Sequence, residues 1–238
     1  VGAEAVASDD PDEWPAHTKL VWINSPGNPD GRVLSVDELQ DAVTRAREIG
    51  AVLASDECYA ELGWDAPWDT ERVPSVLDPA VVGDDLTDVL SVYSLSKQSN
   101  LAGYRAAFLA GDPALVARLL MGRKHLGLMP PAPVQRAMTV ALGDDAHVAA
   151  QRELYARRRA LLKPAVEAAG FTIDRSEGGL YLWATEGRDA WESVGRLADL
   201  GILVGPGHFY GEHFPNHVRF SLTATDERIG AAAERLQA

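Results

Sequence analysis

The chain has 238 residues, of which 46% are apolar and 24% charged, values typical of a folded globular protein with one large or two small domains. Its formal net charge of −13 argues against nucleic acid and anionic membrane surfaces as main partners. Cys58 is the only cysteine and no apolar run approaches the ~20 residues of a membrane span, so we expect a protein without disulfides, located in the cytoplasm.

The first half of the chain predicts alternating strands and helices. Residues 1–16 are small and acidic and predict a loop. Ser35 predicts the start of a helix, because Glu38 stands at the capping-box position, apolar residues follow at helical spacing, and Gly50 ends the pattern. The expected strands are Thr18–Ile23, Ala51–Ala54, Val89–Leu95 and Ala106–Ala110. A strand, a helix and a strand with short links imply a parallel pair.

The second half is first helical and then mixed. We expect helices over Ala114–Leu126, Val134–Leu142, His147–Ala169, Trp191–Leu200 and Glu227–Ala238. Two strands are expected within Phe171–Ala184 and another over Val218–Leu222, whereas Gly205-Pro206-Gly207 predicts a turn. The pattern predicts an α/β fold with a mainly parallel sheet and a small C-terminal α+β part, divided into residues 1–150 and 151–238.

The chemistry centres on the loop after Val89–Leu95. A lysine just past a buried strand is unusual, because burying an ammonium costs several kcal/mol without compensation. Ser94 and Ser96 add hydroxyls and Arg105 adds a planar fork of donors, a set that can hold phosphate oxygens. Lys97 could then condense with an aldehyde on the same ligand as a Schiff base. The alternative is a solvated loop whose lysine and arginine face water.

Polar residues also follow two other predicted strands. Asn28 comes after the first strand, and Asp56 and Tyr59 come after the second. Ligands of open α/β sheets bind at the carboxyl ends of strands, so these side chains are candidates for the same site. Taken singly, Asn28 could belong to a tight turn, Asp56 could cap a helix, and Arg219 near the C-terminus could be an exposed strand residue.

Four patterns in this order resemble the fold-type I, pyridoxal-phosphate-dependent aminotransferases: N-P-x-G at 28–31, D-x-x-Y at 56–59, S-x-S-K at 94–97 with Arg105, and R-x-S at 219–221. The resemblance implies that Asp56 pairs with the pyridinium nitrogen of pyridoxal 5′-phosphate (PLP). It further implies a Schiff base on Lys97 and phosphate contacts from Ser94 and Arg105, with Ser96 a further cofactor-binding residue.

The same resemblance assigns the remaining residues. Asn28 and Tyr59 would hydrogen-bond to the cofactor oxygen O3′, and Arg219, with Asn28, would bind the substrate carboxylate. Lys97, Asp56 and Tyr59 would be catalytic, with Lys97 moving a proton between the substrate Cα and cofactor C4′. Amino-acid and 2-oxo-acid substrates and a homodimer are implied.

Two stretches, SLSKQSNLAGYRAAFLAGD at 94–112 and GLYLWA at 179–184, are most similar to N-succinyldiaminopimelate aminotransferases of lysine biosynthesis. This similarity implies N-succinyl-LL-2,6-diaminopimelate and 2-oxoglutarate as substrates. A carbon–sulfur lyase of the same fold and a non-catalytic or truncated chain stay open as alternatives. No metal site is expected, because Pro215 interrupts the helical spacing of His213 and His217.

The resemblance also leaves part of the family unmatched. Family members have a long portion before the strand that corresponds to Thr18–Ile23, which implies a segment covering the substrate, a helix N-terminus at the phosphate and an aromatic ring on the cofactor. No counterpart of these features is found in the chain. We therefore expect the four strands of the sheet to leave apolar edges exposed.

Overall fold

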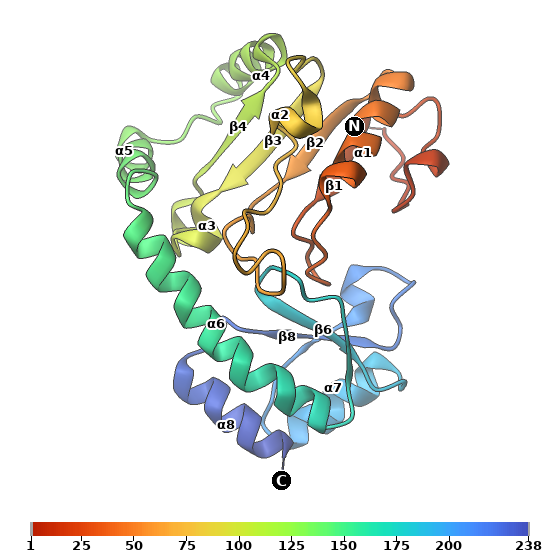
Figure 1. The fold of residues 1–238 in the computed structure, drawn as a ribbon, viewed down its shortest axis with the longest axis vertical. Helices are drawn as coiled ribbons and strands as arrows, with labels where there is room; N and C mark the ends of the chain where they lie inside the picture. Colours follow the sequence, from red (N-terminus) through yellow and green to blue (C-terminus); the bar gives the residue numbers. More distant parts are fainter. Residues whose placement is uncertain (1, 238) are drawn as a thin grey trace. The chain divides into compact units, whose positions relative to one another are not determined.

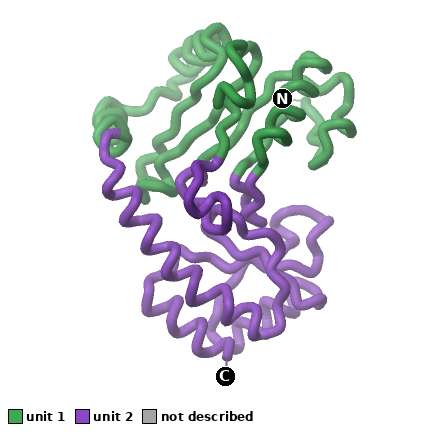
Figure 2. The backbone as a smooth tube through the Cα atoms, in the orientation of Figure 1, with its two compact units in different colours: residues 1–25, 34–58, 74–142 green, residues 26–33, 59–73, 143–238 purple. Residues whose placement is uncertain are grey.

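The computed structural model describes residues 2–237, which form two compact units (Figure 2). Unit 1 contains the chain up to Ser25, Leu34–Cys58 and Pro74–Leu142. Unit 2 contains Pro26–Val33, Tyr59–Val73 and the chain from Gly143 onward. The units thus differ from the expected division at residue 150, because two loops from the first half of the sequence belong to the C-terminal unit.

Unit 1 is built on a four-stranded sheet in the order β1-β2-β3-β4 (Figure 1). Its strands are β1 (Leu20–Asn24), β2 (Val52–Asp56), β3 (Val89–Ser94) and β4 (Ala107–Gly111). The first three run parallel, and β4 is antiparallel to β3. The predicted α/β class with a mainly parallel sheet is therefore confirmed.

Helix α1 (Val36–Glu48) has the predicted capping box, in which the Ser35 hydroxyl accepts from the N–H of Glu38 and the Glu38 carboxylate accepts from the N–H of Ser35. After the helix, Gly50 has the left-handed φ of +66° that its end requires. Together with the short helix α2 (Pro79–Val82), α1 buries one apolar face against the sheet. The buried residues of this core are Val21, Leu39, Ala42, Val43, Ala46, Ala51, Leu53, Val76, Val81, Val82 and Val89.

The rest of unit 1 is much more exposed. It comprises α3 (Leu95–Gln98), α4 (Pro113–His125), α5 (Ala132–Ala141) and two 3₁₀ turns, η1 (Pro11–Glu13) and η2 (Ala102–Tyr104). Neither α4 nor α5 has a buried residue, and the two helices line an apolar groove of about 490 Å³ beside β4. In the outer strands of the described sheet, Trp22 on β1 and Phe108 on β4 are exposed.

Unit 2 contains a second, antiparallel sheet in the order β5-β6-β8-β7. Its elements are α6 (Asp145–Ala168), β5 (Thr172–Asp174), β6 (Tyr181–Thr185), α7 (Ala190–Asp199), β7 (Gly205–Pro206), η3 (Gly207–Tyr210), β8 (His217–Ser221) and α8 (Asp226–Leu236). Helices α6 and α8 lie side by side (Figure 1). The predicted turn at 205–207 instead starts with a two-residue strand, which pairs with Arg219 and Val218.

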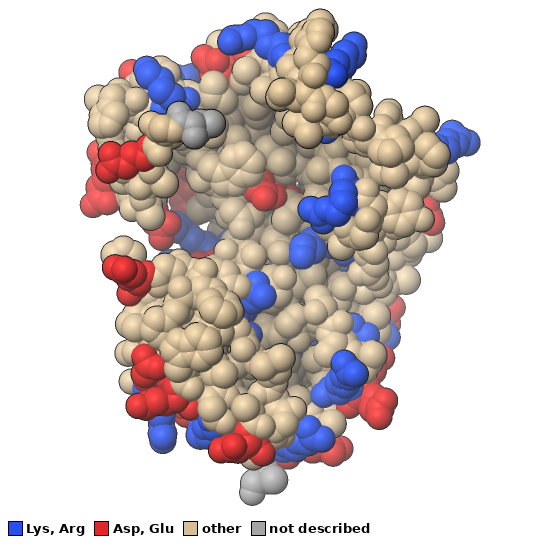
Figure 3. Space-filling model, turned by 180° about the vertical axis from the view of Figure 1, so that it is seen from behind, with Lys and Arg blue, Asp and Glu red and all other residues tan. Residues whose placement is uncertain are grey.

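Basic and acidic side chains are interspersed with uncharged areas on the face drawn in Figure 3. Among the described helices, none combines the length and the apolar character needed to cross a membrane.

Candidate functional site

Asp56 stands at the carboxyl end of β2, where the predicted site begins. Its partners in the sheet register are Asn24 on β1 and Val92 on β3. The Asn24 side-chain amide donates to the backbone carbonyl of Asp56 at 2.8 Å, and the Asp56 carboxylate accepts from the N–H of Cys58 at 3.2 Å. The half-buried carboxylate is thereby fixed at the edge of the parallel strands.

The lysine loop follows the neighbouring strand. Ser94 ends β3 and caps α3, because its hydroxyl accepts from the N–H of Ser96 at 3.2 Å. The same hydroxyl lies 2.8 Å from the Ser96 hydroxyl and 3.2 Å from the carbonyl of Ala106. Lys97 is half-buried on this short helix. The exposed Arg105 has a left-handed φ of +52°, and its Nη1 donates within its own turn to the carbonyl of Ala102 at 3.0 Å.

Cys58 lies two residues after Asp56 and is affected by the charges of both Asp56 and Lys97. Burial raises the pKa of its thiol to about 12, and the charge of Asp56 and a hydrogen bond to it act in the same direction. The positive charge of Lys97 lowers the pKa of the same thiol, so both charges lie near it. Cys58 itself is a neutral thiol at physiological pH, and the nucleophilic candidate at this edge is the amine of Lys97.

A buried carboxylate beside this site was not predicted from the sequence. Glu57 is only 4% exposed and accepts hydrogen bonds from the hydroxyls of Ser75 at 2.8 Å and Ser91 at 2.9 Å, and from the N–H of Val76 at 2.8 Å. Glu57 thus connects Ser75 and Val76 to Ser91 on β3. The sequence shows two adjacent acidic residues but does not indicate which one is buried.

The second group of predicted residues lies entirely in unit 2. The guanidinium of Arg219, on β8, stacks on the ring of Tyr181 at 3.8 Å from its centre and faces Tyr210 at 5.3 Å. Its Nη1 donates to the side-chain oxygen of Asn28 at 3.0 Å. Its Nε is buried without a hydrogen-bond partner among the described residues, so the guanidinium keeps donor capacity.

Tyr59 completes this group. It is 3% exposed, and its ring meets the ring of Tyr181 edge-on, with 6.2 Å between centres and 73° between planes. Asn28, Tyr59 and Arg219 come from three separate sequence patterns, and the structure brings them to one unit around Tyr181. The sequence alone does not indicate Tyr181 as a site residue, although it lies in the GLYLWA stretch.

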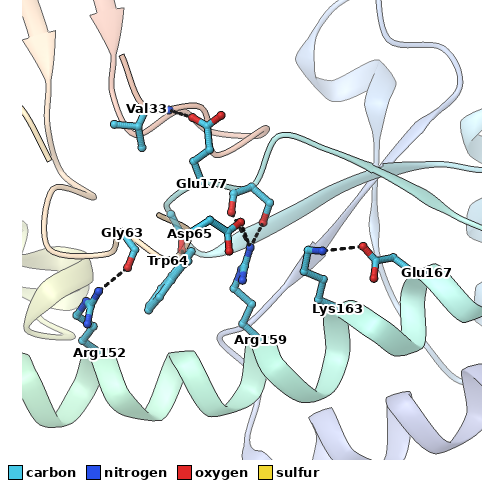
Figure 4. Close-up of polar contacts among 11 residues, drawn as sticks. Val33, Gly63, Trp64, Asp65, Arg152, Arg159, Lys163, Glu167 and Glu177 are labelled. Carbon is cyan, nitrogen blue, oxygen red and sulfur yellow. Dashed lines mark hydrogen bonds and ion pairs between the residues drawn. The ribbon is translucent and has the colours of Figure 1, made fainter. Parts of the chain in front are cut away.

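Two arginines on α6 brace the loop that carries Tyr59 (Figure 4). Arg152 donates to the carbonyls of Gly63 at 2.7 Å and Asp69 at 2.8 Å. Arg159 donates to the carboxylate of Asp65 at 2.8 Å and also to a backbone carbonyl on the β5–β6 connection. The basic middle of the predicted long helix therefore has a structural partner within unit 2.

Comparisons with known proteins agree on one family. The sequence model described as aminotransferase class I and II matches residues 3–236. The chain is 60% identical over 218 residues to the 4-dedimethylamino-4-oxo-anhydrotetracycline transaminase OxyQ of Streptomyces rimosus, a match covering 92% of this chain and 59% of that protein. It is 56% identical over 222 residues to a probable aminotransferase of Mycobacterium tuberculosis, covering 93% of this chain and 52% of that protein.

A solved structure gives the same result for the fold. The chain superposes on a probable N-succinyldiaminopimelate aminotransferase of Thermus thermophilus with a TM-score of 0.79 and 28% identity, over 92% of this chain and 58% of that chain. The chain thus spans between about half and three fifths of the length of the relatives that it matches.

Proposed function

The chain belongs to the class I and II aminotransferases and has their fold, fold type I of the PLP-dependent enzymes, and from this membership we propose that it moves an amino group between an amino acid and a 2-oxo acid. The observation that carries the proposal is that Asp56 ends β2 and Lys97 follows β3, two adjacent parallel strands whose carboxyl ends lie at the same edge of the sheet. A carboxylate and an amine at one sheet edge are the two groups that PLP chemistry requires.

The residues of unit 1 fit the cofactor by their chemistry. When bound, PLP supplies an aldehyde that an amine can attack and a ring that withdraws electrons. We assign Asp56 to the ring nitrogen and Lys97 to the aldehyde, after which Lys97 would move a proton at the substrate Cα. The adjacent hydroxyls of Ser94 and Ser96 support the assignment of both to the phosphate, and Arg105 would add a charged fork of donors once it turns from its own carbonyl partner.

The residues of unit 2 fit two further roles, hydrogen bonding to the cofactor oxygen O3′ and binding of the substrate carboxylate. Asn28 and Tyr59 would donate hydrogen bonds to O3′ of the cofactor, and Arg219 would bind the substrate carboxylate together with Asn28. The planar guanidinium of Arg219 supports this role, because it can donate two parallel hydrogen bonds to a carboxylate. Its stacking on Tyr181 holds the plane of the fork in place before substrate arrives.

Two observations favour different substrates. The likeness to the Thermus thermophilus structure and the resemblance of the lysine loop support N-succinyl-LL-2,6-diaminopimelate with 2-oxoglutarate, in lysine biosynthesis. The 60% identity to OxyQ supports a second candidate, a polycyclic ketone that receives the amino group. A cytoplasmic location and a homodimer complete the proposal; the single cysteine supports the first and the family resemblance the second.

The absorbance spectrum of the purified chain with added PLP tests the proposal. We expect a band at roughly 400–430 nm in the wild-type chain and in Lys163→Ala, and its loss in Lys97→Ala. Glutamate should bleach the band, and 2-oxoglutarate should restore it. Release of pyruvate without an oxo acid would instead indicate a carbon–sulfur lyase, and absence of the band would support the non-catalytic alternative.

With the band established, N-succinyl-LL-2,6-diaminopimelate and an amino-bearing polycycle are each compared as donors. The compound that bleaches the band at the lower concentration identifies the class of amino donor that the chain uses. Arg219→Lys should raise the donor concentration needed to bleach the band by about 10- to 100-fold, because an ammonium cannot reproduce the planar fork of hydrogen-bond donors.

A further inference from the structure

The two loops that carry Asn28 and Tyr59, residues 26–33 and 59–73, contain no helix or strand of their own. Both nevertheless belong to unit 2, whereas the residues before and after them in the sequence belong to unit 1. Their conformation must therefore be held by other parts of unit 2. Besides the contacts of α6 with the second loop, both loops contact the same four residues between β5 and β6, Ser176–Gly179, which we call the linking segment.

The linking segment pairs with the Asn28 loop through its backbone. The N–H of Ser176 donates to the carbonyl of Asp30 at 2.9 Å, and the N–H of Gly178 donates to the carbonyl of Gly31 at 2.8 Å. The approach is so close that a Cβ at Gly31 would lie 2.5 Å from the carbonyl oxygen of Gly178. This contact therefore requires glycine at position 31, where φ is +75°.

The opposite edge of the linking segment pairs with the Tyr59 loop. The N–H of Gly179 donates to the carbonyl of Leu62, and the N–H of Trp64 donates to the carbonyl of Glu177, both at 2.8 Å. The indole N–H of Trp64 adds a hydrogen bond to the carbonyl of Gly179 at 2.6 Å. Gly63 and Gly178 form a β-bridge between these two stretches.

Glu177 contacts both loops at once. Its carboxylate accepts the N–H of Val33 at 2.8 Å, at the end of the first loop, while its backbone carbonyl accepts from Trp64 in the second (Figure 4). Val33 is buried, so without this carboxylate its N–H would lose its described partner. One side chain thus links the segment to the loop of Asn28, and its backbone links it to the loop of Tyr59.

The backbone leading into Glu177 is strained. Arg175 and Ser176 have left-handed φ values of +55° and +80°, although neither is glycine. Ser176 is fully buried, and its carbonyl accepts from Arg159 of α6 at 2.8 Å. Such a conformation persists only where its surroundings enforce it, and the paired loops together with Arg159 provide that enforcement.

We infer that Glu177 is a positioning residue, which holds the Asn28 and Tyr59 loops in one arrangement with Arg219 and Tyr181. The inference rests on the proposed function, because Asn28 and Tyr59 matter for catalysis only if they meet the cofactor at O3′. Glu177 acts through the loops and touches neither Arg219 nor Tyr181 in any described hydrogen bond.

Hydrogen exchange of the full chain without PLP tests the holding contact. We expect Glu177→Ala to speed amide exchange in residues 26–33 by about tenfold or more, because the buried N–H of Val33 loses a charged acceptor, while the backbone hydrogen bonds to residues 59–73 remain. Glu177→Gln keeps a carbonyl oxygen for Val33 and should exchange like the wild type. Glu167→Ala is the matched control, because it removes a glutamate whose ion pair among the described residues runs along α6, to Lys163 (Figure 4). Unchanged exchange in residues 26–33, or an equal rise throughout the chain, overturns the inference.

The PLP complex tests the positioning role. Loss of ordered donors at O3′ should raise the pH midpoint of the cofactor absorbance change in Glu177→Ala, with rescue in Glu177→Gln. Faster loop exchange with an unchanged midpoint would overturn positioning and leave a structural contact alone. If the wild-type chain forms no PLP band, the proposed function fails, while the exchange measurement still decides whether Glu177 holds the loops.

Discussion

Replacing Glu57 tests whether the carboxyl edge of the unit 1 sheet is held by a buried carboxylate. Its side chain is 4% exposed and accepts three hydrogen bonds from neutral donors at 2.8–2.9 Å. A hydrogen bond to a charged group contributes about 1.5–3 kcal/mol, and alanine would also leave the N–H of Val76 buried without this acceptor. Because neighbouring contacts are not additive, and removing the carboxylate also removes its desolvation cost, we expect Glu57→Ala to lower the free energy of unfolding by about 3–5 kcal/mol.

Glutamine at the same position should behave differently. Its carbonyl oxygen can accept from Val76, and its amide can donate to the hydroxyls of Ser75 and Ser91, which then act as acceptors. The loss for Glu57→Gln should therefore stay within about 1.5 kcal/mol. Glu48→Ala is the control, since it removes a surface ion pair with Arg45 and should cost less than about 1 kcal/mol.

Urea unfolding gives the free energies of unfolding, and amide exchange in β2 and β3 assigns the loss to unit 1. The reasoning is refuted if Glu57→Ala loses less than about 1 kcal/mol, or if the alanine and glutamine variants lose the same amount.

Three further predictions use other parts of the chain. Gly31→Ala should lower the melting temperature clearly more than Gly83→Ala, because both have positive φ but only the first would place its Cβ against a carbonyl, at 2.5 Å; equal shifts would contradict this. Iodoacetamide at pH 8 should modify Cys58 roughly a thousandfold more slowly than a free cysteine, because burial raises its pKa to about 12; rapid modification of the folded chain would exclude that environment. The N–H of Asp88 and two helix N–H groups lower the pKa of Asp112, so its stabilising effect is present above about pH 4 and lost as the pH falls through the lowered pKa. Melting curves from pH 7 to 2.5 should accordingly show Asp112→Asn to be less stable at neutral pH and the difference to shrink in acid; a constant difference would contradict the titration.

The sequence predicted the features that depend on local chemistry. The capping box of Ser35 and Glu38 was found because both partners stand in one helical turn. The strands of unit 1 were located within a few residues, because apolar runs are bounded there by polar turn formers. The third strand ends at Ser94 instead of the expected Leu95, because the Ser94 hydroxyl caps α3 and Leu95 is already helical.

The sequence could not predict contacts that depend on strand register. Pairing of β6 with β8 places Tyr181 opposite Ser221, and the neighbouring Arg219 then stacks on the Tyr181 ring. Nothing local to GLYLWA indicates which later strand it faces. The role of Glu177 was hidden for the same reason, because its partners Val33 and Trp64 lie more than a hundred residues away in the chain.

In the D-x-x-Y pattern, the residues between the two proposed site positions also make structural contacts. Asp56 fixes its carboxylate on the N–H of Cys58, Glu57 buries its own carboxylate among three donors, and Tyr59 meets Tyr181 edge-on. Asp56 and Glu57 are adjacent acids with opposite surroundings, since one is half-buried at the sheet edge and the other is enclosed. A comparison that keeps only the first and last positions of the pattern omits Glu57. Removal of Glu57 should nevertheless disturb the end of β2, which carries Asp56. A chain with the same first and last residues of the pattern but without this glutamate would need another way to hold the end of that strand.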